Sequence, residues 1–212
     1  MGSTVVSGRE VFIHPHALVE TTDIGAGTRV WAFAHVMSGA RVGAGCNICD
    51  HAFIEGGAVV GDGVTVKNGV AIWDRVTIED QVFLGPNCVL TNDFNPRAQF
   101  RKSHAELLPT RIGRGATIGA NATIVCGVTI GRSAFIGAGT VVIRSVPDFA
   151  VMVGNPARQV GWMCVCGTRL SLTVRAAKGE STICKGCGRT FSLAAEGLTE
   201  TAGPIAILVE AK

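Results

Sequence analysis

An aliphatic residue recurs at every sixth position over most of this chain. The repeat runs from Ile24 to Leu90 and resumes from Ile112 to Val142. A period of six fits neither the 3.6-residue turn of a helix nor the alternation of an ordinary strand. It suits short strands joined by corners, with three strands in each turn. The eighteen repeat positions are Ile24, Val30, Val36, Val42, Ile48, Ile54, Val60, Val66, Ile72, Ile78, Leu84, Leu90, Ile112, Ile118, Ile124, Ile130, Ile136 and Val142.

One turn of such a structure contains 18 residues, so residues 18 apart would lie above one another at a spacing of about 4.8 Å. Three glycines follow this interval, at Gly25, Gly43 and Gly61. We expect the chain to bend sharply there, because glycine has no Cβ. The pattern predicts an all-β prism of parallel strands.

The repeat is suspended between Leu90 and Ile112. The intervening segment, 91–111, is rich in polar and basic side chains. Loops of this length within a compact fold are usually functional or disordered. We therefore expect an extruded loop that covers an anionic substrate. The alternative is a solvent-exposed loop that only contacts a neighbouring subunit.

Composition favours small-molecule chemistry. The 212 residues carry a formal net charge of +3 and only 17% charged side chains, so no strong field would attract nucleic acid or a membrane surface. The chain has no apolar stretch long enough to span a bilayer and no secretory signal at its N-terminus. We expect a cytoplasmic protein that binds neither nucleic acid nor membrane.

The eight cysteines fall into two groups, and disulfides are not expected in a reducing compartment. Cys46 and Cys88 precede repeat positions by two residues, which indicates small core positions. Four later cysteines form two glycine-ended pairs, and four thiolates suit a closed, structural Zn²⁺ site. The alternative is a β-hairpin with four free thiols. The late cysteines are Cys164, Cys166, Cys184 and Cys187.

Four segments add a resemblance to a known family. They are VWAFAHV at 30–36, VKNGVAIWD at 66–74, TNDFNPR at 91–97 and VGNPARQVGWM at 153–163. With the repeat, they resemble the hexapeptide-repeat acyltransferases, which fold as left-handed parallel β-helices. Within that family the chain looks most like the bacterial UDP-2-acetamido-3-amino-2,3-dideoxy-D-glucuronate N-acetyltransferase group, which supplies sugars for lipopolysaccharide and other surface polysaccharides.

The resemblance implies an acetyl-CoA-dependent N-acetyltransferase acting on a nucleotide-linked amino sugar. It also implies a homotrimer, because relatives place the acceptor site between adjacent prisms. An isolated prism would leave Trp31, Phe33 and Trp73 partly exposed, which favours the same assembly.

Acetyl transfer to an amine needs a neutral amine, a donor for the developing oxyanion and an acceptor for the released proton. The 18-residue interval places Asp74 directly over Asn92, with Asn68 on the neighbouring corner, so we expect these three side chains to line one groove along the prism and to take part in catalysis. His35 falls outside the aliphatic positions, so we expect it to point outward and to orient the sugar or accept a proton. The alternatives are a surface imidazole and corner side chains that satisfy backbone groups. Some relatives need no protein base.

Within the loop, Arg97 is the expected phosphate ligand, since a guanidinium matches phosphate oxygens and the Asn95–Pro96 turn fixes its direction. Lys102 is the second candidate cation. We expect Asn95, Arg97 and Lys102 to bind the nucleotide sugar.

The resemblance places acetyl-CoA beside the last coils and the segment that follows them. The corresponding residues are Gly137, Ala138, Val142, Arg144, Asn155, Pro156, Ala157 and Arg158. They offer an apolar slot for the pantetheine arm and cations for the phosphates.

These observations predict a β-helical acyltransferase domain over residues 1–162 and a small zinc-ribbon-like β unit over 163–212, whose apolar end at 205–209 would form a closing strand. Two other functions stay open: O-acetylation of a sugar or of serine, and a non-catalytic scaffold whose ribbon binds a partner.

Overall fold

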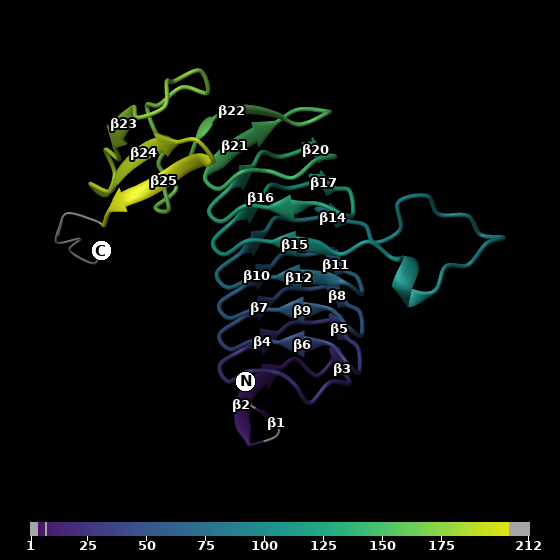
Figure 1. Ribbon diagram of the computed structural model, residues 1–212. Helices are drawn as coiled ribbons and strands as arrows, with labels where there is room; N and C mark the ends of the chain where they lie inside the picture. The colour runs from purple at the N-terminus through teal and green to yellow at the C-terminus, as the bar shows by residue number, and fades with distance from the viewer. Residues whose placement is uncertain (1–3, 7, 204–212) are drawn as a thin grey trace.

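The computed structural model describes residues 4–6 and 8–203 and is an all-β structure. Short strands wind into a three-sided prism, and a small antiparallel sheet lies beside its C-terminal end (Figure 1). The predicted parallel β-helix is confirmed. The apolar run at 205–209 lies outside the described residues. Among those described, no helix is long and apolar enough to cross a membrane.

Each face of the prism is one sheet, in which every strand pairs in parallel with the strand one coil away. The first face contains β2 (Arg9–Ile13), β4 (Arg29–Val30), β7 (Asn47–Ile48), β10 (Thr65–Val66), β13 (Phe83–Leu84), β16 (Thr117–Ile118), β19 (Phe135–Ile136) and β21 (Ala150–Val153). At its ends β1 (Thr4–Val6) pairs antiparallel with β2, and β22 (Arg158–Trp162) pairs antiparallel with β21.

The other two faces follow the same register. The second face contains β3 (Leu18–Val19), β5 (His35–Val36), β8 (Phe53–Ile54), β11 (Ala71–Ile72), β14 (Val89–Leu90), β17 (Thr123–Ile124) and β20 (Val141–Val142). The third contains β6 (Arg41–Val42), β9 (Val59–Val60), β12 (Val76–Ile78), β15 (Thr110–Ile112) and β18 (Thr129–Ile130).

The core is the column of repeat residues. All eighteen are at most 3% exposed, and the small residues two positions earlier, such as Ala34 and Ala116, are buried between them. Truncating one buried aliphatic side chain costs about 2–5 kcal/mol, so the column supplies much of the stability. With the inward positions filled, functional side chains must lie on the outward faces and corners.

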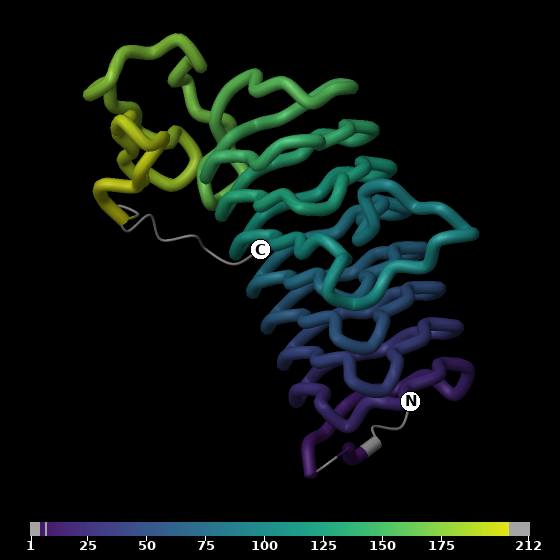
Figure 2. Tube along the Cα trace, turned by 45° about the vertical axis from the view of Figure 1, so that its right-hand side comes forward, coloured from purple at the N-terminus to yellow at the C-terminus, as the bar shows by residue number. Residues whose placement is uncertain are grey.

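The loop leaves the prism after β14 and returns at β15 (Figure 1). It therefore ends at Pro109, two residues earlier than predicted, because Thr110 and Arg111 pair with Val76 and Thr77 of β12. Its one regular element is the short 3₁₀ helix η1 (His104–Glu106). Figure 2 shows the loop projecting from the middle of the stack.

A three-stranded antiparallel sheet follows the prism. It consists of β23 (Ser181–Ile183), β24 (Thr190–Ala194) and β25 (Gly197–Ala202). Phe191 of this sheet packs against Phe149 of the last coil in a T-shaped contact, with ring centroids 5.3 Å apart, and both rings are fully buried. The small sheet is thus joined to the prism by a shared core.

The glycines at 18-residue intervals have a different role from the one predicted. A Cβ on Gly43 would lie 2.5 Å from the carbonyl carbon of Gly61 in the next coil. The left-handed backbone angles occur two residues later, for example at Gly45 with φ +64°. Gly43 is therefore required by the close approach of two coils and not by a bend.

We expect Gly43→Ala to destabilise the protein by about 1–3 kcal/mol, the usual cost of forcing extra atoms into a packed site. Gly45→Asn is the matched control, because nothing lies within 4 Å of an added Cβ there and Asn tolerates the left-handed region. Denaturant unfolding of both variants at one protein concentration measures the difference. Equal losses would contradict the close-approach argument.

Candidate active site

One corner of the prism, between the second and third faces, collects the polar groups of interest. The strand register stacks Asp74 under Asn92, and continues through Cys126 to Arg144. The side-chain amide of Asn92 donates to the carbonyl oxygen of Asp74 at 3.4 Å. The predicted stacking of Asp74 and Asn92 is therefore present. We call this column, from Asp74 to Arg144, the loop corner, because the loop emerges from it.

A pocket of about 420 Å³ opens at the upper end of the loop corner. Its walls come from the segment after β20 and from the turn between β21 and β22, which places two arginines around an apolar floor. The lining residues are Ile143, Arg144, Ser145, Met152, Pro156, Ala157 and Arg158. The structure thus brings together four of the eight residues expected at the CoA site: Arg144, Pro156, Ala157 and Arg158.

The other four expected CoA residues do not line this pocket. Asn155 adjoins it through Pro156, whereas Gly137 and Ala138 lie on the corner before β20. Val142 is fully buried in the core, so its side chain cannot touch a ligand. Sequence reasoning missed Ile143 and Met152, which supply apolar surface in their place.

The loop is tied to the prism at several points. The backbone N–H of Leu108 donates to the carbonyl oxygen of Asn92 at 2.9 Å, which joins the two ends of the loop at its base. Arg75 donates through Nη1 to the carbonyl oxygen of His104 at 3.3 Å, and the His104 ring contacts the Asp74 carboxylate. The loop therefore lies against the same corner that carries the pocket.

The predicted loop cations differ in their surroundings. Lys102 forms an ion pair with Asp93, which also accepts the backbone N–H of Asn95 at 3.0 Å. Arg97 is exposed, and its guanidinium donates to the carbonyl oxygen of Pro96 at 3.1 Å. Of the two, only Arg97 keeps its charge unopposed by a carboxylate within the described loop.

His35 and Asn68 lie away from the loop corner. His35 points outward from β5, as predicted, but its strand is two coils below β11. Its Nε2 lies 3.3 Å from the Glu20 carboxylate, and the Ser38 backbone N–H, followed by His35, lowers the pKa of Glu20. Asn68 is exposed on the corner before β11, so the width of one face separates it from Asp74.

Comparison with known proteins gives the family. The model for the bacterial transferase hexapeptide (six repeats) matches residues 21–56 and 109–144. Over 189 residues, 89% of this chain and 94% of the relative, the sequence is 47% identical to dTDP-3-amino-3,6-dideoxy-alpha-D-galactopyranose 3-N-acetyltransferase from Aneurinibacillus thermoaerophilus. The chain belongs to the hexapeptide-repeat acetyltransferases. It is an acyltransferase built on their left-handed β-helix.

Solved structures of similar proteins include the acetyltransferase domain of PglB from Neisseria gonorrhoeae with acetyl coenzyme A, at 25% identity and a TM-score of 0.47. A variant of GDP-perosamine N-acetyl transferase from Caulobacter crescentus, with CoA and GDP-perosamine, gives the same two values. The match covers 71% of this chain and 57% and 56% of those chains.

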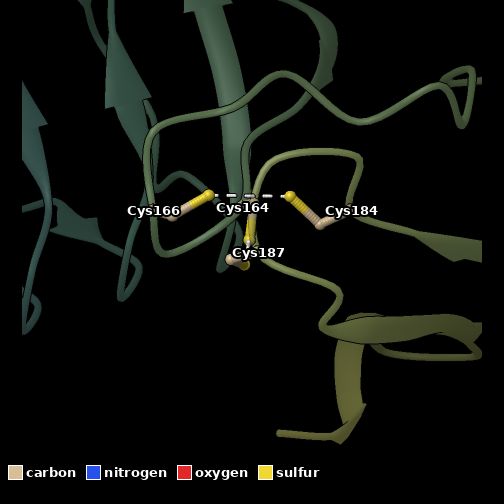
Figure 3. A group of neighbouring side chains, drawn as sticks. All are labelled: Cys164, Cys166, Cys184 and Cys187. Atoms are coloured by element: carbon tan, nitrogen blue, oxygen red, sulfur yellow. Dashed lines mark hydrogen bonds between the residues drawn. The ribbon is translucent and has the colours of Figure 1, made fainter. Parts of the chain in front are cut away.

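The late cysteines of this acetyltransferase converge (Figure 3). Their four sulfur atoms all lie within 4.8 Å of one another, with Cys164 and Cys187 paired at 3.5 Å and Cys166 and Cys184 at 3.6 Å. Desolvation raises the pKa of Cys164. Among the described residues, this is the one cluster of three or more histidine, cysteine or acidic side chains with metal-binding geometry. The donor set and its compactness fit Zn²⁺.

The cysteines of the acetyltransferase prism are core residues. Cys46 and Cys88 are each 1% exposed, and burial raises the pKa of Cys88 to about 12. A thiol with so high a pKa is a poor nucleophile and a poor metal ligand at neutral pH. The sequence interpretation of these two positions as core packing is confirmed.

Proposed function

We propose that the protein transfers the acetyl group of acetyl-CoA to the amino group of a nucleotide-linked amino sugar. The relative at 47% identity, whose name states this chemistry for a dTDP-linked 3-amino sugar, carries the proposal. The geometry supports it, because a pocket with two arginines and a loop with an exposed arginine share one corner.

The pocket fits the cosubstrate. Ile143, Met152 and Pro156 offer apolar contact for the pantetheine arm, and Arg144 and Arg158 offer cations for the phosphates of CoA. Three coil spacings of about 4.8 Å separate Arg144 from Asp74 along the corner, or about 14 Å. The extended pantetheine arm can span this distance and deliver the thioester to the base of the loop.

The acceptor class is tested with acetyl-CoA and a panel of nucleotide sugars, including dTDP-3-amino-3,6-dideoxygalactose, a UDP-3-amino-uronate and their hydroxyl counterparts. We expect CoA thiol release and the mass gain of one acetyl group with an amino sugar only. Transfer to hydroxyl sugars or to serine would establish the O-acetyltransferase alternative. If CoA thiol is not released and CoA does not raise the melting temperature, the protein is the non-catalytic scaffold. The link to surface polysaccharide and the cytoplasmic location stay predictions.

If the nucleotide sugar and CoA bind at separate sites, substitution of Arg97 should weaken binding of the sugar only, and substitution of Arg158 binding of CoA only. Losing a charge-assisted contact costs about 1.5–3 kcal/mol, which is roughly ten- to hundred-fold in affinity. We expect Arg97→Ala to weaken nucleotide-sugar binding by this factor and to leave CoA binding unchanged. Arg158→Ala should do the reverse. Calorimetric titration of both ligands measures this, and parallel losses in either variant would contradict it.

We further propose that the four late cysteines hold a structural Zn²⁺, since four sulfur ligands leave no open position for catalysis. Chelation should remove one zinc per chain and increase hydrogen exchange over residues 163–195, with the β-helix still folded. Cys187→Ser should lose the metal, whereas Cys126→Ala in the prism should keep it. Metal analysis without zinc after purification free of chelator would contradict the site.

We propose that three chains associate through the second face of the prism. Its outward positions are mostly apolar, including Leu18 at 53% and Val89 at 48% exposure, and Phe53 packs beside Trp73 on the same face. The Trp73 indole donates to the carbonyl oxygen of Leu90 at 2.7 Å, which holds the ring against the neighbouring coil.

Light scattering at micromolar concentration should give three times the chain mass of 22.0 kDa. Val89→Glu would place a charge in each proposed interface and should lower this mass, whereas Arg41→Gln on the third face should not. A monomeric wild-type protein would rule out the trimer.

A further inference from the structure

The loop corner contains a histidine–carboxylate pair that joins two distant parts of the chain. His104 Nδ1 contacts Asp74 Oδ2, across 30 residues of sequence. The geometry points to His104 as a catalytic residue: held by Asp74, its Nε2 takes the proton that the substrate amine loses and passes it to the departing CoA sulfur. This assignment rests on the proposed function and adds a residue to it.

Both members of the pair are fixed by their surroundings, Asp74 by the prism and His104 by the first turn of η1. Asp74 is fixed to the prism, because its backbone N–H donates to the Glu55 carboxylate at 2.8 Å. A Cβ on Gly57 would overlap the Asp74 carboxylate, so this glycine leaves the space in which the carboxylate lies. His104 begins η1, where Glu106 accepts both the backbone N–H and the hydroxyl of Ser103.

The partner of Nδ1 determines the state of the other ring nitrogen. A carboxylate accepts a hydrogen bond, so the neutral imidazole carries its proton on Nδ1 and has a lone pair on Nε2. The His104 side chain is 66% exposed and that of Asp74 only 18%. The histidine is therefore accessible to a substrate, while its carboxylate partner is largely covered.

Position distinguishes this histidine from the others. The other carboxylate-paired histidine, His35, lies on a flat face two coils lower. His16 and His51 stack on either side of Phe33, with ring planes within 13° of parallel. His104 alone among the five histidines lies on the corner that leads to the CoA pocket.

Acetyl transfer through His104 needs no reactant other than the amino sugar and acetyl-CoA. The amine nitrogen attacks the thioester carbonyl carbon, a C–N bond forms, and Nε2 of His104 accepts the proton from nitrogen. The C–S bond then breaks, and the imidazolium gives this proton to the departing thiolate. The products are the amide and CoA thiol, and His104 returns to its neutral form. A positioned base of this kind contributes about 10²–10⁴ in rate.

Two substitutions separate proton transfer from loop anchoring. His104→Asn keeps a donor that can bond Asp74 but has no second ring nitrogen, so it tests the base alone. His104→Ala removes both functions and leaves space for free imidazole. His14→Asn is the matched control, because the Asn oxygen can replace the Nδ1 that accepts the His16 backbone N–H at 3.1 Å.

Steady-state kinetics with the acceptor identified in the panel should show a kcat at least about 100-fold lower for His104→Asn, with KM for both substrates within about threefold of wild type. Free imidazole should restore activity to His104→Ala and leave the activity of His14→Asn unchanged. Thermal melting verifies that each variant is folded.

A kcat above one third of wild type in His104→Asn overturns the assignment. A fall in kcat that imidazole does not restore, with KM rising in parallel, also overturns it and makes His104 a loop anchor. Both outcomes require active wild-type enzyme, so they are distinct from failure of the proposed function, in which wild type acetylates nothing on the panel.

Discussion

Burial of one aliphatic side chain in every six residues is the constraint on which the rest of this structure depends. Strands of two or three residues have no independent stability. They persist because each repeat residue is enclosed by the three faces and each strand is hydrogen-bonded to the coils above and below. The interior is filled by these residues, so all chemistry is displaced to the corners and outward positions.

The column of repeat residues could be predicted completely, since a period is a local property that needs no knowledge of contacts. The stacking of Asp74 under Asn92 follows from the same arithmetic. The 18-residue interval no longer identifies stacked residues across the loop, because the loop adds residues between two coils. Asn92 and Cys126 are neighbours in the stack although 34 residues separate them in sequence, so the sequence did not reveal that Arg144 shares the corner with Asp74.

Other features depend on contacts that no spacing encodes. The approach of His104 to Asp74 requires the loop to fold back, which Leu108, Arg75 and the first turn of η1 accomplish together. The role of Gly43 depends on the distance between coils. The burial of Val142, by contrast, follows from its place in the six-residue repeat, so its expected contact with CoA was already at odds with the period. The cysteine cluster was easier to predict, because few arrangements bring four closely spaced thiols together other than a metal site.

The strands at the two ends of the prism determine whether another chain can add further coils. A stack of parallel coils is a template with no inherent limit, since the last strand of each face presents unpaired backbone groups to any further strand. Here β1 and β22 run against the direction of their neighbours, and Phe191 covers the final coil at Phe149. An antiparallel strand cannot continue a parallel winding. On the first face, the parallel winding is therefore closed at both ends by an antiparallel strand, which disfavours fibre-like, end-to-end polymerisation.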